Sequence, residues 1–142
     1  MKTLNVLIVD GQGGGIGRQL VEEIKNARLP CRVTAVGTNT AATGAMLKAG
    51  AEQGATGENA VVVACRRAEV IVGPLGIALA DALMGEITPA MAHAVTASDA
   101  DRILIPMNLC QTYVAGVSRS SSAILEDAAA RIRQLRDEKQ SQ

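Results

Sequence analysis

The sequence predicts one α/β domain, a three-layer Rossmann-like or flavodoxin-like sandwich around a mostly parallel sheet of about five strands. The first indication is its start, LNVLIVDGQGGGIGRQL, where an apolar run at 6–9 leads into a turn with five glycines. Apolar residues then recur at helical spacing from Ile16 to Ile24. The second indication is a pair of later apolar runs, at 69–73 and 102–106, each preceded by a helical stretch, as parallel strands require.

Length and composition limit the kind of protein. The 142 residues suit one domain, which we expect over 1–138 with a frayed tail at 139–142. The net charge is zero, basic residues form no stripe, and Tyr113 is the single aromatic residue, so nucleic-acid binding is disfavoured. No apolar run approaches the ~20 residues of a membrane helix, and the chain starts directly with a strand, not a signal peptide. We therefore expect a cytoplasmic protein.

The three cysteines predict no metal site. They are odd in number, scattered and without zinc-ligand spacing, so we expect free thiols in a reducing compartment. They are Cys31, Cys65 and Cys110.

The first helix and the second strand follow the glycine-rich turn. We expect the helix over 14–27, and Pro30 marks the loop before a strand at 31–36. In that strand Arg32 and Thr34 lie among apolar residues. Such mixed polarity is typical of a strand near the sheet edge, because central parallel strands are apolar throughout.

A second helix and a long loop are expected next. Asn39 or Thr40 can cap a helix over 41–49. Gly50 stands where a C-terminal glycine ends a helix. The segment 51–59 has few apolar residues, so we interpret it as a functional loop or lid.

The stretch 60–68 fits either a strand or a helix. Its letters AVVVAC have strand propensity, but the chain continues directly into the strand at 69–73, and a parallel strand needs a crossover first. We therefore predict a short helix over 58–67. Residues 77–84 are apolar nearly all round, which predicts a buried helix or a subunit interface.

Two more helices and two more strands complete the expected sandwich. A Thr-Pro pair predicts a helix over 88–97. Strands are predicted at 102–106 and 112–117, and serine caps predict a last helix over 120–138. With the apolar first, third and fourth strands central and the second near an edge, we expect the strand order 2-1-3-4-5, with 3-2-1-4-5 as the alternative.

The glycine-rich turn predicts a ligand site. Glycines allow positive φ and a close approach to a ligand, and the N–H groups and dipole of a helix start attract an anion such as phosphate. The alternative is a tight turn in which glycines serve close helix–sheet packing. Three adjacent glycines, 13–15, exceed what packing alone needs, so we favour a nucleotide or phosphate site.

Two known phosphate-binding turns offer a comparison. Gly11, Gly15 and Gly17 fit G-x-x-x-G-x-G, and GGGIGRQL is similar to the cofactor turn of short-chain dehydrogenases. This similarity makes NAD(P) or another nucleotide a candidate cofactor. A ParA-type ATPase loop is disfavoured, because Arg18 and Gln19 stand where that loop needs Lys and then Ser or Thr.

The dehydrogenase similarity is confined to this first unit. Residues 36–39 after the second strand offer no acidic residue for an NAD ribose and no adjacent Arg for a 2′-phosphate. Tyr113 is followed four residues later by Val117, where a dehydrogenase has Lys. The resemblance therefore does not imply hydride transfer.

Four further motifs resemble one family over nearly the whole chain. They are DGQGGGIG, GTNTAATGAMLKAGA, GATGENAVVV and VGPLGI. The family they resemble consists of short uncharacterised bacterial proteins that are classed as a domain of unknown function. The resemblance implies a Rossmann-like fold and no particular activity.

Ligands of parallel sheets bind outside the carboxyl ends of the strands, so the polar and glycine-rich turns there should form one site. Asp10 either holds a metal-bound water or a ribose hydroxyl, or caps the turn. Glu58 is either a general base or an exposed residue at a helix start. The candidate ligand-binding residues are Asp10, Gly11, Gln12, Gly13, Gly14, Gly15, Gly37, Thr38, Asn39, Thr40, Glu58, Asn59, Gly73, Pro74 and Asn108.

No catalytic residue is assigned. Cys110 is the best-placed thiol, after the strand at 102–106, but a nucleophile needs a lowered pKa and a base. The only histidine, His93, falls on a predicted helix. A Cys–His pair is therefore not expected.

These observations predict a protein that binds a nucleotide or another phosphate-bearing small molecule, and they leave open whether it is an enzyme. The alternatives are a noncatalytic nucleotide-sensing or regulatory module and a structural subunit without a ligand. We also expect a homodimer, because one small domain has difficulty covering residues 77–84 together with Met91 and Val95.

Overall fold

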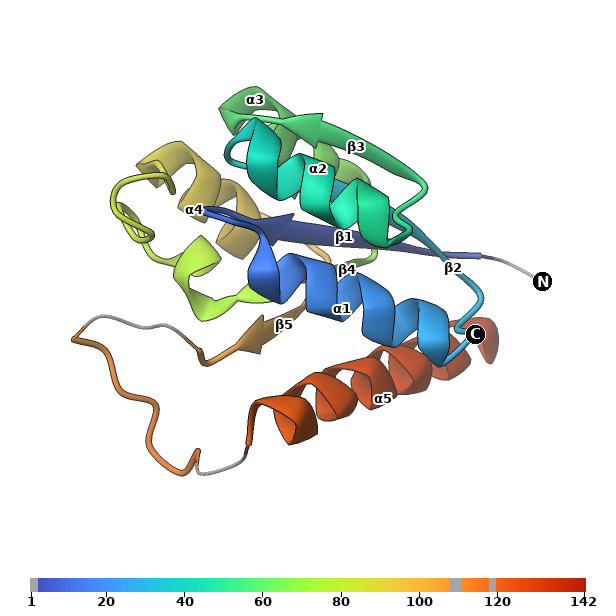
Figure 1. The fold of residues 1–142 in the computed structure, drawn as a ribbon. Helices are drawn as coiled ribbons and strands as arrows, with labels where there is room; N and C mark the ends of the chain where they lie inside the picture. Colours follow the sequence, from blue (N-terminus) through green and yellow to red (C-terminus); the bar gives the residue numbers. More distant parts are fainter. Residues whose placement is uncertain (1–2, 108–110, 118–119) are drawn as a thin grey trace.

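The structure is a computed structural model that describes residues 3–107, 111–117 and 120–142. Helices cover both faces of a five-stranded sheet, in which every pair of neighbouring strands is parallel (Figure 1). The expected fold class is therefore confirmed. The strands, in the order β3-β2-β1-β4-β5, are β1 Leu4–Asp10, β2 Cys31–Gly37, β3 Gln53–Thr56, β4 Val70–Pro74 and β5 Asp101–Ile105.

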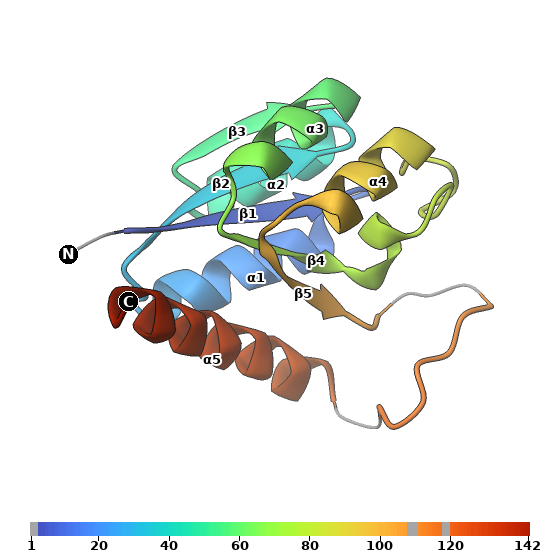
Figure 2. The ribbon, with the colours of Figure 1, turned by 180° about the vertical axis from the view of Figure 1, so that it is seen from behind.

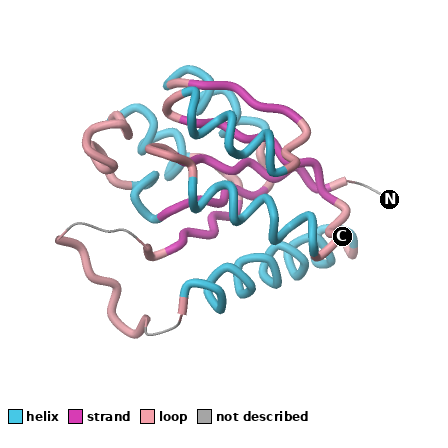
Figure 3. The backbone as a smooth tube through the Cα atoms, in the orientation of Figure 1, coloured by secondary structure: helices cyan, strands magenta, loops and turns pink. Residues whose placement is uncertain are grey.

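The helices form two layers, and helices alternate with strands along most of the chain (Figure 3). One layer holds α1, α2 and α5, and the other holds α3 and α4 (Figure 1, Figure 2). The α-helices are α1 Gly15–Asn26, α2 Thr40–Ala49, α3 Glu58–Arg67, α4 Pro89–Ala97 and α5 Ser121–Gln140.

The central strand β1 divides the core into two halves. Its side chains point alternately to the two faces. Val6 and Ile8 pack with residues of α1 and α5, whereas Leu7 and Val9 pack with residues of α3 and α4. The apolar run that marked this strand in the sequence is thus buried on both faces, as a central parallel strand requires.

Polar side chains begin three of the helices. Asn39 accepts the N–H of Ala42 and caps α2, which settles the choice between Asn39 and Thr40. Thr88 accepts the N–H of Met91 and caps α4, and Ser120 caps α5. These capped starts and the helix predicted over 58–67 are confirmed.

The segment 51–59 is not a long loop, contrary to the sequence-based expectation. It contains strand β3 at Gln53–Thr56, and α3 begins at Glu58. Within the described sheet, strand β3 pairs only with β2, and all four of its residues are exposed. An edge strand with no buried side chain carries no apolar pattern, so no feature of the sequence indicated this strand.

The extra strand also shifts the positions of the others. Strand β2 is second from the edge, in agreement with the expectation of a strand near an edge. Strand β5, expected in the centre, forms the opposite edge of the described sheet. Residues 111–117 contain no strand, so the strand expected at 112–117 is absent from the described part of it. The four strands that were predicted correctly are β1, β2, β4 and β5, and their order, β2-β1-β4-β5, agrees with the preferred order 2-1-3-4. When β3 is counted as well, the whole sheet has the alternative order 3-2-1-4-5.

Residues 77–84 do not form the expected buried helix. A short 3₁₀ turn, Leu75–Ala78, is followed by turns in which Leu83 and Met84 have positive φ. Ile77 is fully buried, but Met84 is 95% exposed. The stretch crosses the carboxyl edge of the sheet between β4 and α4, so its apolar side chains are divided between the core and the surface.

Three of the apolar residues that motivated the homodimer are internal, whereas Leu79 and Met84 of the same stretch are exposed. Ile77, Met91 and Val95 are buried within the monomer, against Val61 of α3 and its neighbours. The reason given for self-association therefore holds only in part, because the small domain covers these three side chains itself but leaves Leu79 and Met84 exposed. Self-association as such stays a prediction.

Candidate functional site

Asp10 closes the glycine-rich turn from the inside. It is the last residue of β1, and its buried carboxylate accepts the N–H of Gly11 at 2.8 Å and the N–H of Gly17 at 2.7 Å. Gly17 belongs to the first turn of α1, whose N-cap residue Gly14 provides no side-chain cap. Asp10 therefore caps the helix, the second of the two roles expected for it, and its charge faces the positive end of the helix dipole.

The glycines of the turn fall into two groups, according to what a side chain would meet. Gly14 has a φ of +73°, and a Cβ there would lie 2.8 Å from the Cα of Ala42. A Cβ on Gly17 would lie 2.5 Å from a methionine sulfur of α2. Packing requires glycine at both positions. Gly13 and Gly15 have no atom within 4 Å of a Cβ and no positive φ, so packing does not require glycine there.

Open N–H groups surround a small cavity at this turn. Among the residues that the structure describes, no acceptor contacts the N–H of Gly13, Gly15 or Ile16, which is the usual state of the first residues of a helix. The cavity of about 80 Å³ is far smaller than the roughly 300–1,000 Å³ of a typical ligand pocket, so it suits a small group such as a phosphate but not a whole nucleotide. It is lined by Asp10, Gly11, Gln12, Gly13, Gly14, Gly15, Ile16, Pro74 and Leu83.

Glu86 holds the outer side of the turn. One of its carboxylate oxygens accepts the N–H of Gln12 at 2.9 Å, the side-chain amide of Asn39 at 2.8 Å and the hydroxyl of Thr38. The amide of Asn39 also donates to the carbonyl of Gln12 at 2.9 Å. The turns after β1 and β2 and the chain after β4 thus meet at the carboxyl edge of the sheet, as the topology predicts.

The two carboxyl groups at the turn have pKa values shifted in opposite directions. Burial raises the pKa of Asp10 above its ordinary 3.8, the N–H groups of Gly17 and Gly11 oppose this rise, and the charge of Glu86 adds to it. The hydroxyl of Thr38 lowers the pKa of Glu86 below its ordinary 4.5, helped by the donors from Gln12 and Asn39 and opposed by partial burial. Glu86 is therefore firmly ionised at neutral pH.

Three other predicted site residues lie at the same edge of the sheet. A Cβ on Gly37 would lie 2.5 Å from the hydroxyl oxygen of Thr43, and a Cβ on Gly73 would lie 2.4 Å from the carbonyl oxygen of Val9. Close packing therefore requires both glycines. Pro74 lines the cavity directly.

The remaining predicted residues are not part of the cavity lining. Glu58 and Asn59 begin α3, and Glu58 accepts the hydroxyl of Thr88 at 2.5 Å, which ties the starts of α3 and α4 together. Thr40 is the exposed first residue of α2. Asn108 lies outside the described residues.

Among the described residues, no hydrogen bond joins a cysteine thiol to His93, although Cys65 and His93 line the same groove. Burial raises the pKa of Cys31, and it raises that of Cys65 to about 11, so both thiols are weak nucleophiles. His93 lines a groove between α3 and α4, and Cys110 lies outside the described residues. No group of three or more His, Cys, Asp or Glu side chains in the described ranges is arranged to hold a metal ion.

The sequence matches a domain of unknown function, DUF3842, over residues 5–137. The chain belongs to this family. The match runs from β1 into α5, so it includes the glycine-rich turn and the whole described sheet. No curated protein and no solved structure matches the chain.

The sequence analysis missed Ile16, Leu83 and Glu86 of this DUF3842 site. Ile16 directly follows the predicted Gly15 and lines the cavity. Leu83 and Glu86 come from the stretch between β4 and α4, where an apolar helix was expected at 77–84. The signal was the Gly85-Glu86 step, which interrupts the apolar run just before the capped helix start at Thr88. A glycine and an acidic residue between a strand end and a helix start indicate a loop at the carboxyl edge.

None of the helices in the described part of this DUF3842 protein combines the length and the apolar character needed to cross a lipid bilayer.

Proposed function

We propose that this DUF3842 protein binds a phosphate-bearing small molecule, in the first place a nucleotide, at the carboxyl edge of its sheet. The proposal rests on Gly13 and Gly15. No packing contact requires glycine at either position, and their N–H groups are open beside a cavity of about 80 Å³. An anion of phosphate size can accept these N–H groups at the start of α1. The rest of a nucleotide would extend outward over the neighbouring turns.

Two carboxylates constrain how the phosphate binds. Both carboxylate oxygens of Asp10 accept hydrogen bonds from backbone N–H groups, so this side chain is a structural part of the turn. Glu86 accepts hydrogen bonds from Gln12, Thr38 and Asn39, which are the donors that a ligand would otherwise contact on that side. Either a divalent cation bridges Glu86 and the phosphate, or ligand hydroxyls replace the carboxylate. Added Mg²⁺ strengthens binding in the first case and leaves it unchanged in the second.

The test is a thermal-shift and calorimetric screen of nucleotides, NAD(P) and sugar phosphates, with and without Mg²⁺. A ligand that binds only the native state raises the melting temperature. Gly13→Val places a side chain in the open space of the turn, so it should abolish binding while the melting temperature of the free protein stays near that of the wild type.

Gly44→Val is the matched control for this screen. Gly44 also has no atom within 4 Å of a Cβ and no positive φ, but it lies on α2, outside the cavity lining. The control should bind the ligand like the wild type. Absence of binding by every nucleotide and sugar phosphate at millimolar concentration, or full binding by Gly13→Val, would contradict the proposal.

We propose that the protein is a binding or sensing module, and we assign no enzymatic activity to it. Beside the cavity the described acidic side chains are Asp10, which is fully engaged, and Glu86, which is firmly ionised. Cys31 and Cys65 are buried thiols with raised pKa values. We also propose a cytoplasmic location, where these free thiols stay reduced.

A further inference from the structure

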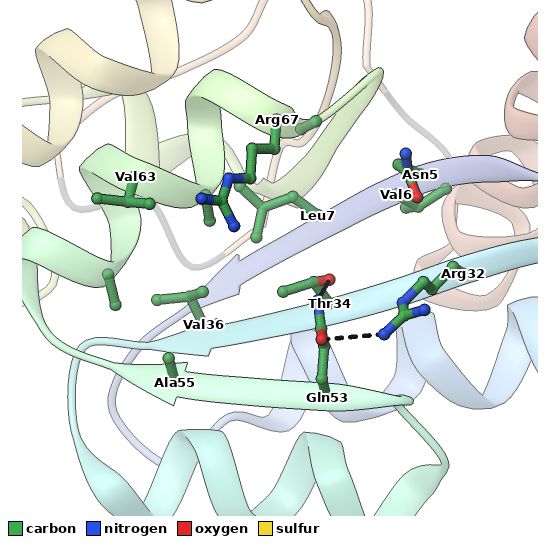
Figure 4. A pocket seen from close by; sticks show the side chains of 13 residues that line it. Asn5, Val6, Leu7, Arg32, Thr34, Val36, Gln53, Ala55, Val63 and Arg67 are labelled. Carbon is green, nitrogen blue, oxygen red and sulfur yellow. Dashed lines mark hydrogen bonds between the residues drawn. The ribbon is translucent and has the colours of Figure 1, made fainter.

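A second and larger hollow lies on the face of the sheet that α3 covers. It is an open groove of about 300 Å³ between α3 and strands β1, β2 and β3 (Figure 4). It shares no lining residue with the cavity at the glycine-rich turn. The groove is therefore independent of the proposed phosphate site.

The groove exists because small side chains face one another across it. Ala60 and Ala64 of α3 lie on one side, and Ala55 of the exposed strand β3 lies on the other. Between them the lining is apolar, with buried Leu7 and Val36 of the two inner strands. An apolar ligand chain could cover this surface, which the fold leaves partly open to water.

Polar groups at the groove are basic or neutral. Among the described residues, the two charged ones that line it are Arg32 of β2 and Arg67 at the end of α3, and none of the lining residues is acidic. Figure 4 shows Arg67 reaching from α3 toward the strands and Arg32 lying beside Gln53. Gln53 accepts a hydrogen bond from Arg32 at 3.1 Å and donates to the hydroxyl of Thr34 at 2.9 Å, so Arg32 is held over the sheet.

We propose that this groove binds a small amphipathic carboxylate, such as a medium-chain fatty acid. Its chain would lie on the apolar surface, and its carboxylate would meet the guanidinium group of Arg67, whose planar donors match a carboxylate, while Arg32 would add positive charge farther along the groove. At roughly 30 Å³ per water-sized group, 300 Å³ holds about ten non-hydrogen atoms, which is the size of octanoate. Such a ligand would act at a site separate from the phosphate.

Octanoate is therefore the probe, titrated into the full chain by calorimetry, with octanol and acetate as comparison ligands. Octanoate should bind, and octanol and acetate should bind at least tenfold more weakly, because each lacks one half of the recognition. Equal binding of octanol would show that the arginines play no part, and equal binding of acetate would show that the apolar surface plays none. Either result, or no binding of octanoate at millimolar concentration, overturns the proposal.

Arginine variants locate the site. Arg67→Gln should weaken octanoate binding by roughly tenfold or more, the usual scale for losing a charge-assisted hydrogen bond, and Arg32→Gln should weaken it less. Arg66→Gln is the matched control, because Arg66 is also exposed in the last turn of α3 but lines the other groove, between α3 and α4. Melting curves check that all three variants fold. If Arg66→Gln weakens binding as much as Arg67→Gln does, net charge explains the effect and the site is wrong.

Discussion

Replacing Gly14 with alanine should destabilise the protein, whereas the same change at Gly13 should not. Gly14 has a φ of +73°, and its new Cβ would collide with the backbone of Ala42. We expect a loss of about 1–3 kcal/mol in the free energy of unfolding. Gly13→Ala meets open space at an ordinary φ, so its stability should stay within about 0.5 kcal/mol of the wild type.

Denaturant unfolding of the two glycine variants measures this difference. Gly44→Ala serves as a second reference, since Gly44 also faces open space. Equal stability of Gly14→Ala and Gly13→Ala would mean that α2 gives way without cost, and the division of the glycines into two groups would then be wrong.

At this scale the sequence predicted the turn but not the role of each residue in it. The number of glycines indicated a special turn, yet the distinction between Gly13 and Gly14 depends on where α2 comes to lie, far along the chain. The role of Asp10 was left open for a similar reason. Whether its carboxylate reaches the N–H of Gly17 depends on the shape of the folded turn, which residue types alone do not determine.

At the scale of elements, the chain between β4 and α4 should be held in place more firmly at neutral than at acidic pH. Glu86 fixes it to Gln12, Thr38 and Asn39, and its pKa is lowered. A group with a lowered folded-state pKa contributes stability above its unfolded pKa, near 4.5, and this contribution is lost as the pH falls through the folded value.

Glu86→Gln tests this pH dependence. The glutamine keeps an acceptor oxygen but carries no charge, so the variant should be less stable than the wild type at neutral pH, by about 1 kcal/mol or less for a partly exposed group. The gap should close as the pH falls below 4.5. Melting temperatures of both proteins across this range give the answer, and a gap that does not change with pH would contradict the role of the charge.

Because the pKa of Asp10 is raised, this group changes the stability with pH in the opposite direction to Glu86. Its native carboxyl takes up a proton at higher pH than its unfolded one, so this group gains stability as the pH falls toward 3.8. Both proteins contain Asp10, but the charge of Glu86 contributes to its shift. Glu86→Gln should therefore also reduce the stability that Asp10 gains at acidic pH. This reduction should be smaller than the direct loss of the Glu86 charge, because burial is the leading cause of the Asp10 shift.

The elements that were predicted well were those that topology constrains. The helix α3 has a strand-like sequence, but the parallel strand that follows it requires a crossover segment first. This requirement correctly predicted a helix in place of a strand. The strand β3 and the stretch 77–84 were missed for opposite reasons. The exposed strand carries no apolar pattern, and the apolar stretch does not bury one face.

At the scale of the whole molecule, three of the exposed large apolar side chains lie close together in the sequence between β5 and α5. In the segment 111–117, which extends away from the body of the domain (Figure 1, Figure 2), Tyr113 is 93% exposed and Val114 and Val117 are also exposed. Strand β5 forms an edge of the described sheet, and Val117 and Ile103 line a groove between β5 and α5. An open edge strand with apolar neighbours is a template for pairing with another chain.

We predict that a second copy of the chain covers this surface, so that the protein is a homodimer paired through β5 and the segment 111–117. Light scattering at micromolar concentration should give the mass of a dimer. Tyr113→Asp should shift it toward the monomer without loss of the fold, because Tyr113 makes little contact within its own chain. Met84→Asp is the matched control, since Met84 is 95% exposed in the stretch 77–84, on which the dimer was first expected. A monomeric wild type would exclude the homodimer at that concentration, and dissociation by Met84→Asp alone would move the interface back to that stretch.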